Sequence, residues 1–245
     1  MRRLNWRSGL PLATVVLALA ACAPSKVWTE PSPALARYQI RSVVVLPFGR
    51  ISTPQIFDKP LTPEFNVPRG AERSGIYVPV PPPSPDKQNF TMTIVPASAP
   101  ERVTDMFYER LKRRGGLRVV SPDNATAARS ADADPPESPE QAAAQTARQL
   151  HVDVAVLGRL LVYKEREGPK LAANSAAVGI EVKLIAQDGV TVWVGNYYEK
   201  QRPFVEDVKG FFEHGGVFVT ADELAHYGAD RLVREFPYGL PVQTE

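Results

Sequence analysis

The chain has 245 residues, 44% of them apolar, a formal net charge of +2 and a single cysteine. This length is enough for one sizeable domain, and a single cysteine excludes both a disulfide framework and a cysteine-based metal site. Residues 1–21 contain three arginines and no acidic residue, so removing these three charges from +2 leaves −1 for the remainder. A near-neutral chain lacks the basic footprint of nucleic-acid-binding proteins, and we expect no nucleic-acid partner.

The beginning of the chain has the pattern of a bacterial export signal. Arg2, Arg3 and Arg7 form a positively charged start, and the mostly apolar run Leu10–Ala21 follows. A transmembrane helix needs about 20 apolar residues, so this run is too short to span a bilayer. It fits a signal peptide over residues 1–21.

The segment that ends this run, Leu19-Ala20-Ala21-Cys22, resembles the lipobox of bacterial lipoproteins. The resemblance implies cleavage between Ala21 and Cys22, diacylglycerol on the Cys22 thiol and an acyl chain such as palmitate on the new amine. Two such signals give stable membrane anchoring. Ala23 is not the aspartate that retains lipoproteins at the inner membrane, which implies the periplasmic face of the outer membrane. The alternatives are an unanchored periplasmic protein cleaved near Ala21 and an uncleaved anchor.

The distribution of proline divides the rest of the chain. Most of the 24 prolines lie in a few stretches, which we expect to form linkers or irregular loops, since proline fixes φ and lacks an amide donor. We predict a lipidated tether over residues 22–37 and one domain over residues 38–240. A proline-rich insertion at 49–97 interrupts this domain, and a loop of that length is often functional.

Runs of β-branched or alternating residues predict strands. Asp188-Gly189 predicts a tight hairpin between the last two, because glycine accepts positive φ. The predicted strands are Ile40–Leu46, Ile76–Val80, Phe90–Val95, Leu117–Val120 and residues 152–163, 176–186 and 190–198.

Three helices are predicted from capping boxes, in which Ser or Thr precedes Glu or Gln by three residues. The pairs are Ser98 with Glu101, Ser138 with Gln141, and Thr220 with Glu223. The apolar face of the last helix is expected to comprise Leu224, Tyr227, Leu232 and Phe236. Residues 121–137, rich in alanine, proline and acidic residues, are expected to form a loop. The order of elements predicts a single α/β domain with a mixed sheet and helices packed on it.

Two pairs of segments carry a resemblance to a known family. SVVVLPF with GLRVVSP, and ARQLHVDVAVLGRLLVY with VKLIAQDGVTVWVGNYYEK, resemble envelope lipoproteins of the anticodon-binding-like α/β fold, which include CsgG, LpoB and the amino-terminal domain of TolB. The resemblance covers roughly residues 38–236. It implies a strand-entry contact for Asp153, close packing at Gly158, a turn at Gly189 and a core aromatic at Trp193.

The sequence departs from the pore-forming pattern of CsgG. That protein builds its pore from two long hairpins per subunit, and transmembrane strands need about 9–11 residues each. Only the hairpin over residues 176–198 is long enough here, and we assign it to the core sheet. A pore is therefore not expected.

The sequence offers no catalytic constellation. It contains no nucleophile elbow, phosphate-binding loop or zinc-protease motif. The histidines His151, His214 and His226 lack metal-ligand spacing, and the carboxylate pair Glu165 and Glu167 lies in a polar loop that favours solvation. We predict that the protein is not an enzyme and has neither a metal nor a cofactor.

Two clusters remain as candidate interaction sites. Arg110, Arg113 and Arg114 lie near a predicted helix end, where cations either stabilise the helix dipole or form a basic patch for an anionic partner. Phe211, Phe212 and Phe218 lie among glycines and either pack onto the sheet or form an exposed recognition loop.

Together these features predict a lipid-anchored, periplasmic interaction protein that docks on an envelope or cell-wall complex. The alternative is a structural subunit of an outer-membrane secretion or export assembly similar to the curli system. A small-ligand-binding module is the third and weakest interpretation, because no polar cluster predicts a pocket. The sequence does not define an oligomeric state.

Overall fold

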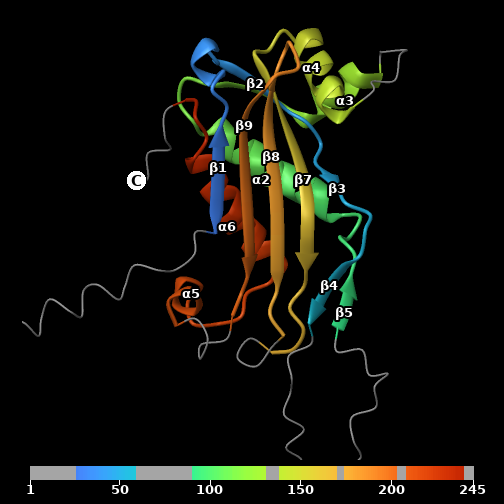
Figure 1. Ribbon diagram of the computed structural model, residues 1–245, viewed down its shortest axis with the longest axis vertical. Helices are drawn as coiled ribbons and strands as arrows, with labels where there is room; N and C mark the ends of the chain where they lie inside the picture. The colour runs from blue at the N-terminus through green and yellow to red at the C-terminus, as the bar shows by residue number, and fades with distance from the viewer. Residues whose placement is uncertain (1–25, 59–89, 131–137, 170–173, 203–207, 240–245) are drawn as a thin grey trace, which may run out of the picture.

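The computed structural model describes residues 26–58, 90–130, 138–169, 174–202 and 208–239 (Figure 1). These residues form one α/β domain around a seven-stranded mixed sheet of order β1-β9-β8-β7-β2-β6, in which β3 also pairs with β7. The strands of this sheet are β1 (Val27–Pro31), β2 (Ser42–Val45), β3 (Gly49–Arg50), β6 (Arg118–Val120), β7 (Val154–Lys164), β8 (Ala177–Ala186) and β9 (Thr191–Lys200). The predicted fold class is confirmed.

Helices cover the sheet unequally. In Figure 1, α2 (Ala99–Lys112) and α6 (Ala221–Arg234) lie behind the long strands, and they contact each other. The other face is covered at one end by α3 (Pro122–Ser130) and α4 (Pro139–Gln149), and near the other end Phe57 packs against Val162 and Ala177 of the long strands. The remaining helical elements are the 3-10 turn η2 (Leu35–Arg37) and the six-residue helix α5 (Val208–Glu213).

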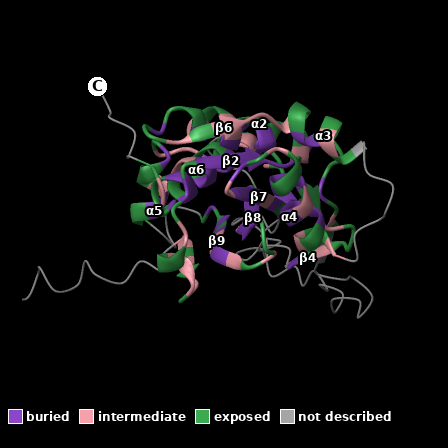
Figure 2. Cartoon of the chain, turned by 90° about the horizontal axis from the view of Figure 1, so that it is seen from above, coloured by how far each residue is buried: buried purple, intermediate pink, exposed green. Residues whose placement is uncertain are grey.

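Strand β2 shows where the core lies. Val43 and Val45 belong to the core beneath α2 and α6, whereas Val44 belongs to the second core beneath α3 and α4. A parallel strand buried on both faces has a continuous β-branched sequence, and this explains why the run was recognisable. Figure 2 shows the same layering, with burial concentrated in the strands and exposure on the outer sides of the helices.

The domain begins earlier than predicted. Val27–Pro31, which fall within the predicted tether, form the edge strand β1 and pair antiparallel with β9. Tyr238 also contacts this segment, since its hydroxyl lies 3.5 Å from the Leu35 carbonyl. The described part of the segment 22–37 is therefore folded into the domain. The predicted signal peptide and Cys22 lie outside the described residues.

The predicted insertion contains a small ribbon of its own. Strands β4 (Gln55–Asp58) and β5 (Phe90–Thr93) pair antiparallel and form a separate two-stranded sheet. Strand β5 matches the predicted strand Phe90–Val95, but no sequence signal predicted its partner. The other predicted strand of the insertion, Ile76–Val80, lies outside the described residues.

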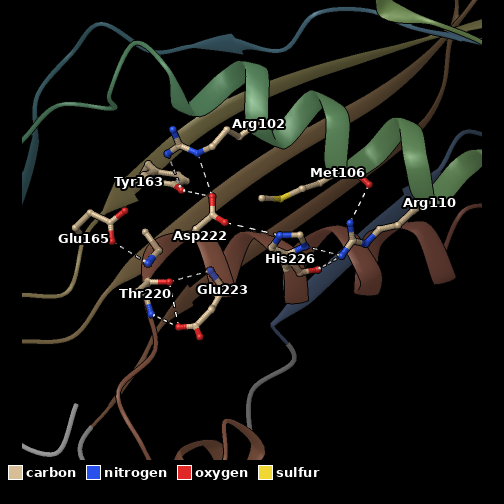
Figure 3. Close-up of polar contacts among 10 residues, drawn as sticks. Arg102, Met106, Arg110, Tyr163, Glu165, Thr220, Asp222, Glu223 and His226 are labelled. Carbon is tan, nitrogen blue, oxygen red and sulfur yellow. Dashed lines mark hydrogen bonds and ion pairs between the residues drawn. The ribbon is translucent and has the colours of Figure 1, made fainter. Parts of the chain in front are cut away.

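The helix boundaries test the capping predictions. Thr220 and Glu223 form a complete capping box at the start of α6 (Figure 3), and the Ser138 hydroxyl accepts a hydrogen bond from the Gln141 amide, 3.1 Å. The prediction that Ser98 and Glu101 form a capping box is wrong. The backbone of Ser98 is already helical, and its side chain makes no capping hydrogen bond. Its hydroxyl instead accepts a hydrogen bond from Arg102, 3.0 Å.

Residues 121–137 are not entirely a loop. Pro122–Ser130 form α3, whose alanine side chains include the fully buried Ala125. The Ser121 hydroxyl lies 3.4 Å from the Asn124 amide at the start of this helix. Among the described residues, no helix combines the length and apolar character needed to cross a membrane.

Asp153 makes the strand-entry contact that the family resemblance implied. Its carboxylate accepts hydrogen bonds from the amide of Arg41, 2.9 Å, and from the amide and hydroxyl of Ser42, both 2.8 Å. Burial raises the pKa of Asp153, but these hydrogen bonds outweigh burial and lower it. The side chain thereby joins the start of β2 to the start of β7.

The other three aligned positions also have the implied roles. A Cβ atom on Gly158 would lie 2.3 Å from the ring of Phe48, so only glycine fits between β7 and that ring. Gly189 has φ of +90° in the β8–β9 turn, as the Asp-Gly signal predicted. Trp193 is buried and packs edge-on against Phe236, with 5.8 Å between ring centroids.

Candidate functional site

The candidate site is the end of the sheet at which the described chain begins, and we name it the Lys26 end. It comprises Lys26 with the start of β1, residues 197–202 at the end of β9, and residues 208–220 from α5 onward (Figure 1). Val27 pairs with Tyr197, and the Tyr198 amide donates to the Lys26 carbonyl, 3.0 Å. The chain therefore enters the sheet where β9 ends, four residues after Cys22 in the sequence.

Glu199 is the centre of a buried polar network at this end. One carboxylate oxygen lies 2.8 Å from the Lys26 ammonium and 2.6 Å from Nε2 of His214, and the other accepts the Tyr197 hydroxyl, 2.5 Å. Lys26 also contacts Glu213 at the end of α5, 2.7 Å. Glu199 is 6% exposed, so a buried charge holds three separate segments together.

The ionisation of this network is fixed by its contacts. Burial by itself raises the pKa of Glu199, but hydrogen bonds from His214, Lys26 and Tyr197 outweigh burial and lower the pKa to about 2. Burial lowers the pKa of Lys26, and its contacts with Glu199 and Glu213 outweigh burial and raise it. At neutral pH Glu199 is an anion and Lys26 a cation, which suits a structural ion pair.

Gln201 extends the attachment to the segment that leads into α6. Its side-chain oxygen accepts from the Val219 amide, 2.8 Å, and its side-chain nitrogen donates to the Val217 carbonyl, 2.6 Å. Gln201 is buried, and its hydrogen bond with the Val219 amide is shielded from water. The segment after α5 is thereby attached to the end of β9.

The predicted aromatic cluster divides into an inside and an outside part. Phe218 is only 4% exposed and packs edge-on against the half-buried Phe211, with 5.6 Å between ring centroids. Phe212 is 63% exposed. The prediction of Phe218 as an interaction residue is therefore corrected, because its buried ring has almost no surface to offer a partner. Of the three, Phe212 presents most of its side chain to a partner.

The histidines are spread over the domain. His214 is buried between Glu199 and the ring of Tyr227, and its Nδ1 has no hydrogen-bond partner among the described residues. His226 lies on the exposed side of α6, and His151 adopts a positive φ of 49° before β7. Within the described ranges, no group of three His, Cys, Asp or Glu side chains has metal-binding geometry.

A second polar cluster joins α2 to α6 and the end of β7, as Figure 3 shows. The Arg102 guanidinium lies 3.1 Å from Asp222 and donates to the Tyr163 hydroxyl, 3.2 Å, which in turn donates to Asp222, 3.1 Å. Glu165, which was expected to be solvated in a loop, accepts a hydrogen bond from the Ala221 amide, 3.1 Å, and so helps to cap α6. These contacts are structural.

The predicted basic patch does not form one surface. Arg110 pairs with Asp230. It also contacts His226, as Figure 3 shows, and Arg113 is exposed. Arg114 is only 5% exposed, and burial lowers the pKa of its guanidinium. The guanidinium of Arg114 donates to the carbonyls at the end of α6, namely those of Val233, Phe236, Tyr238 and Gly239. Arg114, which follows α2, therefore caps the end of α6. This corrects the prediction that Arg114 belongs to a binding patch.

Among the described residues, the face of the sheet opposite α2 and α6 is exposed on β1 and β9 towards the Lys26 end, whereas Phe57 of β4 covers it on β7 and β8. Near the other end α4 covers it, where Lys183 on β8 pairs with Glu140, 2.9 Å. Towards the Lys26 end, Trp28 and Tyr198 are 55% and 53% exposed. Trp28 pairs with Asn196, so Trp28 and Tyr198 are diagonal neighbours on one face.

Sequence reasoning missed the Glu199 network. One signal was available: continuing the alternation of β9 places Glu199 on the same inward face as Trp193 and Tyr197. A carboxylate at an inward position requires a partner, because an unpaired buried charge is costly. The identity of the partners followed no local pattern, since Lys26 and His214 belong to other segments.

Comparisons with known proteins give distant structural similarities only. No protein-family model matches the chain, and no curated protein matches it significantly. The chain is similar to PelC from Paraburkholderia phytofirmans, solved as a dodecamer in two crystal forms. One form has a TM-score of 0.43 at 14% identity over 84% of this chain and 95% of that chain, and the other 0.40 at 13% over 84% and 93%. The hypothetical protein CT253 from Chlamydia trachomatis has a TM-score of 0.37 at 12% identity over 80% and 93%.

Proposed function

We propose that the chain is a lipid-anchored, non-catalytic subunit of an export assembly at the periplasmic face of the outer membrane. The observation that carries the proposal is the attachment of Lys26 to Glu199, four residues after Cys22. Four extended residues span about 14 Å at most, so an anchor on Cys22 would keep the Lys26 end close to the bilayer. A domain held in one orientation presents the same faces to its neighbours, as a subunit of a membrane-bound assembly must.

The use of the charged groups supports a non-catalytic role. Arg114 caps α6, Glu199 holds the start of the chain, and Asp222 joins two helices and a strand. Arg114 and Glu199 are buried and bonded to neighbouring protein groups, and one oxygen of Asp222 is shared by Arg102 and Tyr163. A catalytic acid or base, in contrast, must reach a substrate proton.

The second candidate function is docking on a cell-wall complex. The open sheet face at Trp28 and Tyr198 favours it, because an exposed aromatic face suits a different protein as well as another copy. The two candidates share the lipid anchor and differ in what contacts this face.

The anchor is tested by cell fractionation and mass spectrometry. Wild-type protein should remain in washed membranes with a mature chain that begins at a Cys22 carrying diacylglycerol on its thiol and an acyl chain on its amine. Cys22→Ser should be found in the periplasmic fraction at wild-type abundance. Retention of Cys22→Ser in washed membranes at the wild-type level, or an unmodified Cys22 in the mature wild-type chain, contradicts the proposal.

The partner is tested by photocrosslinking in intact cells. A photoreactive residue replaces Asn196 on the open sheet face, and the matched control replaces the exposed Glu109 on α2. Adducts of Asn196 with another copy, together with a large assembly in mild detergent, support the export subunit. Adducts with a cell-wall synthase support the second candidate. Absence of any adduct specific to position 196 contradicts both.

A further inference from the structure

One face of the β4–β5 ribbon presents large apolar side chains to the outside. Ile56 on β4 and Met92 on β5 are 63% and 61% exposed, and they are direct partners in the register of the two strands. Side chains paired in this way lie about 5 Å apart, so the two form one apolar surface. Ile94, two residues after Met92, is 54% exposed and extends this surface. A group of exposed apolar side chains marks an interaction surface, whereas single ones are ordinary.

The opposite face of the ribbon attaches it to the domain. Phe57, the residue after Ile56, is 7% exposed and packs against Val162 of β7 and Ala177 of β8. The Lys164 ammonium lies over the Phe57 ring, 5.0 Å from its centroid. Neighbouring residues of a strand point to opposite faces, so the burial of Phe57 directs Ile56 away from the sheet. The ribbon is therefore held by one face and presents the other.

The ribbon lies at the Lys26 end of the sheet. Phe57 packs against Ala177 of β8, which pairs with Lys200 of β9. Lys200 follows Glu199, the residue that binds Lys26. The strand beneath the ribbon and the strand that follows Lys26 are two strand spacings apart, about 10 Å. Figure 1 shows the ribbon projecting at the same end of the long strands as α5.

We propose that the exposed face of the β4–β5 ribbon, formed by Ile56, Met92 and Ile94, docks into the acyl-chain boundary of the bilayer that holds the lipid anchor. This inference rests on the anchor of the proposed function. The chain from Cys22 to Lys26 spans about 14 Å at most, so an anchored Cys22 keeps the Lys26 end, and the ribbon with it, beside the bilayer. None of the three side chains carries a charge, which suits lipid hydrocarbon.

The ribbon supplies what a tether alone lacks. A domain held at one point rotates about that point, whereas a second contact about 10 Å to the side fixes its orientation. The ribbon lies on the bilayer with its face and leaves its strand edges among the hydrated headgroups, because the hydrocarbon core offers no hydrogen-bond partners. The exposed sheet face at Trp28 and Tyr198 remains available to the protein partner of the proposed function.

The test places an indole on the ribbon of a chain with little background. Cleavage of the signal peptide removes Trp6, and Trp28→Phe then leaves only Trp193, which is buried. Met92→Trp in this chain reports on the ribbon. The matched control is Val190→Trp in the same chain, an exposed position in the β8–β9 turn, about 30 Å from the Lys26 end along β9.

Each lipidated protein is reconstituted into phosphatidylcholine vesicles with or without lipid brominated on its acyl chains, which quenches indoles that reach the hydrocarbon. We expect quenching at position 92 and none at position 190 above the Trp28→Phe baseline. Ile56→Gln together with Ile94→Gln, added to the Met92→Trp chain, removes the apolar face and leaves the anchor intact. Quenching at position 92 should then be lost. An unchanged midpoint of urea unfolding confirms that each variant is folded.

The outcomes separate the ribbon from the anchor. If mass spectrometry finds no lipid on Cys22, the proposed function fails and the docking inference fails with it. If the protein is lipidated but the indole at position 92 is quenched no more than the baseline, only the docking inference is overturned. Quenching that survives Ile56→Gln and Ile94→Gln also overturns it, because the anchor alone then explains the proximity. A blue-shifted emission at position 92 without bromine quenching assigns the face to a protein segment, of the same chain or of a second copy, and overturns it as well.

Discussion

Arg114 and Glu199 are both buried charges, and the domain accommodates them in different ways. The Arg114 guanidinium is surrounded by backbone carbonyls at the end of α6 and just beyond it, which are neutral acceptors. Glu199 is surrounded by side-chain donors from three segments, and the Lys26 ammonium is one of these donors. The first arrangement completes one helix and is insensitive to pH. The second joins distant segments and depends on the charge of each partner.

The largest effect is expected at Arg114. Arg114→Met should lower the free energy of unfolding by about 4 kcal/mol, because several carbonyls at the end of α6 lose their donors at once. Urea unfolding of the purified protein measures the change. Arg113→Met is the matched control: this neighbouring side chain is exposed, and we expect a change within about 0.5 kcal/mol. Equal losses in the two variants would show that burial of Arg114 does not decide its contribution.

The next effect is a pH dependence carried by Glu199. Its pKa is lowered from 4.5 to about 2 in the folded protein, so the carboxylate stabilises the fold at pH values above about 4.5. This contribution, about 3 kcal/mol at neutral pH, is lost as the pH falls from about 4.5 towards about 2.

Glu199→Gln isolates that contribution, because the amide keeps the shape and removes the charge. The difference in unfolding free energy between wild type and Glu199→Gln should be largest at neutral pH and shrink on acidification through this window. The exposed Glu109→Gln is the control and should show no such change. A difference that stays constant from pH 7 to pH 3 would contradict the ion-pair interpretation.

A close contact without charge should have a smaller effect than either. Gly158→Ala places a Cβ 2.3 Å from the Phe48 ring, and we expect a loss of about 2 kcal/mol from overpacking, measured by thermal unfolding. Gly49→Ala is the control, since its Cβ would meet the nearest atom at 4.0 Å. Phe48→Leu combined with Gly158→Ala should recover part of the loss. Additive losses in the double variant would show that the clash is not with this ring.

The features that were predictable from the sequence are those in which the cause and the effect are close in the chain. Thr220 and Glu223, which are three residues apart, cap the same helix. Asp188-Gly189 forms a turn in which Gly189 has the positive φ that the turn requires. The β-branched run of β2 and the alternation of β8 and β9 also depend on a few neighbours. Each of these predictions was confirmed.

The features that were missed depend on partners far apart in the chain. Arg114 follows a helix and looks like part of a basic cluster, yet its acceptors are carbonyls more than a hundred residues later. β1 is five residues long, and only its pairing with β9 makes it a strand. The Glu199 network has the same origin, because Lys26 reaches it from the other end of the chain. A local pattern does not contain this information.

The smallest loss of unfolding free energy is expected at the Arg102–Asp222 pair. This pair is hydrogen-bonded but not buried, so it tests whether burial or hydrogen bonding determines the contribution of a charge. The charged groups lie within hydrogen-bond distance, 3.1 Å, a little further apart than the contacts of Glu199, and the two side chains are 44% and 41% exposed. Water and salt screen such a pair, so Arg102→Met should cost less than about 1 kcal/mol and the cost should fall further at high salt. Urea unfolding at low and high ionic strength measures both. A loss as large as that of Arg114→Met would mean that shared hydrogen bonds to Tyr163, rather than burial, determine what a charge contributes in this domain.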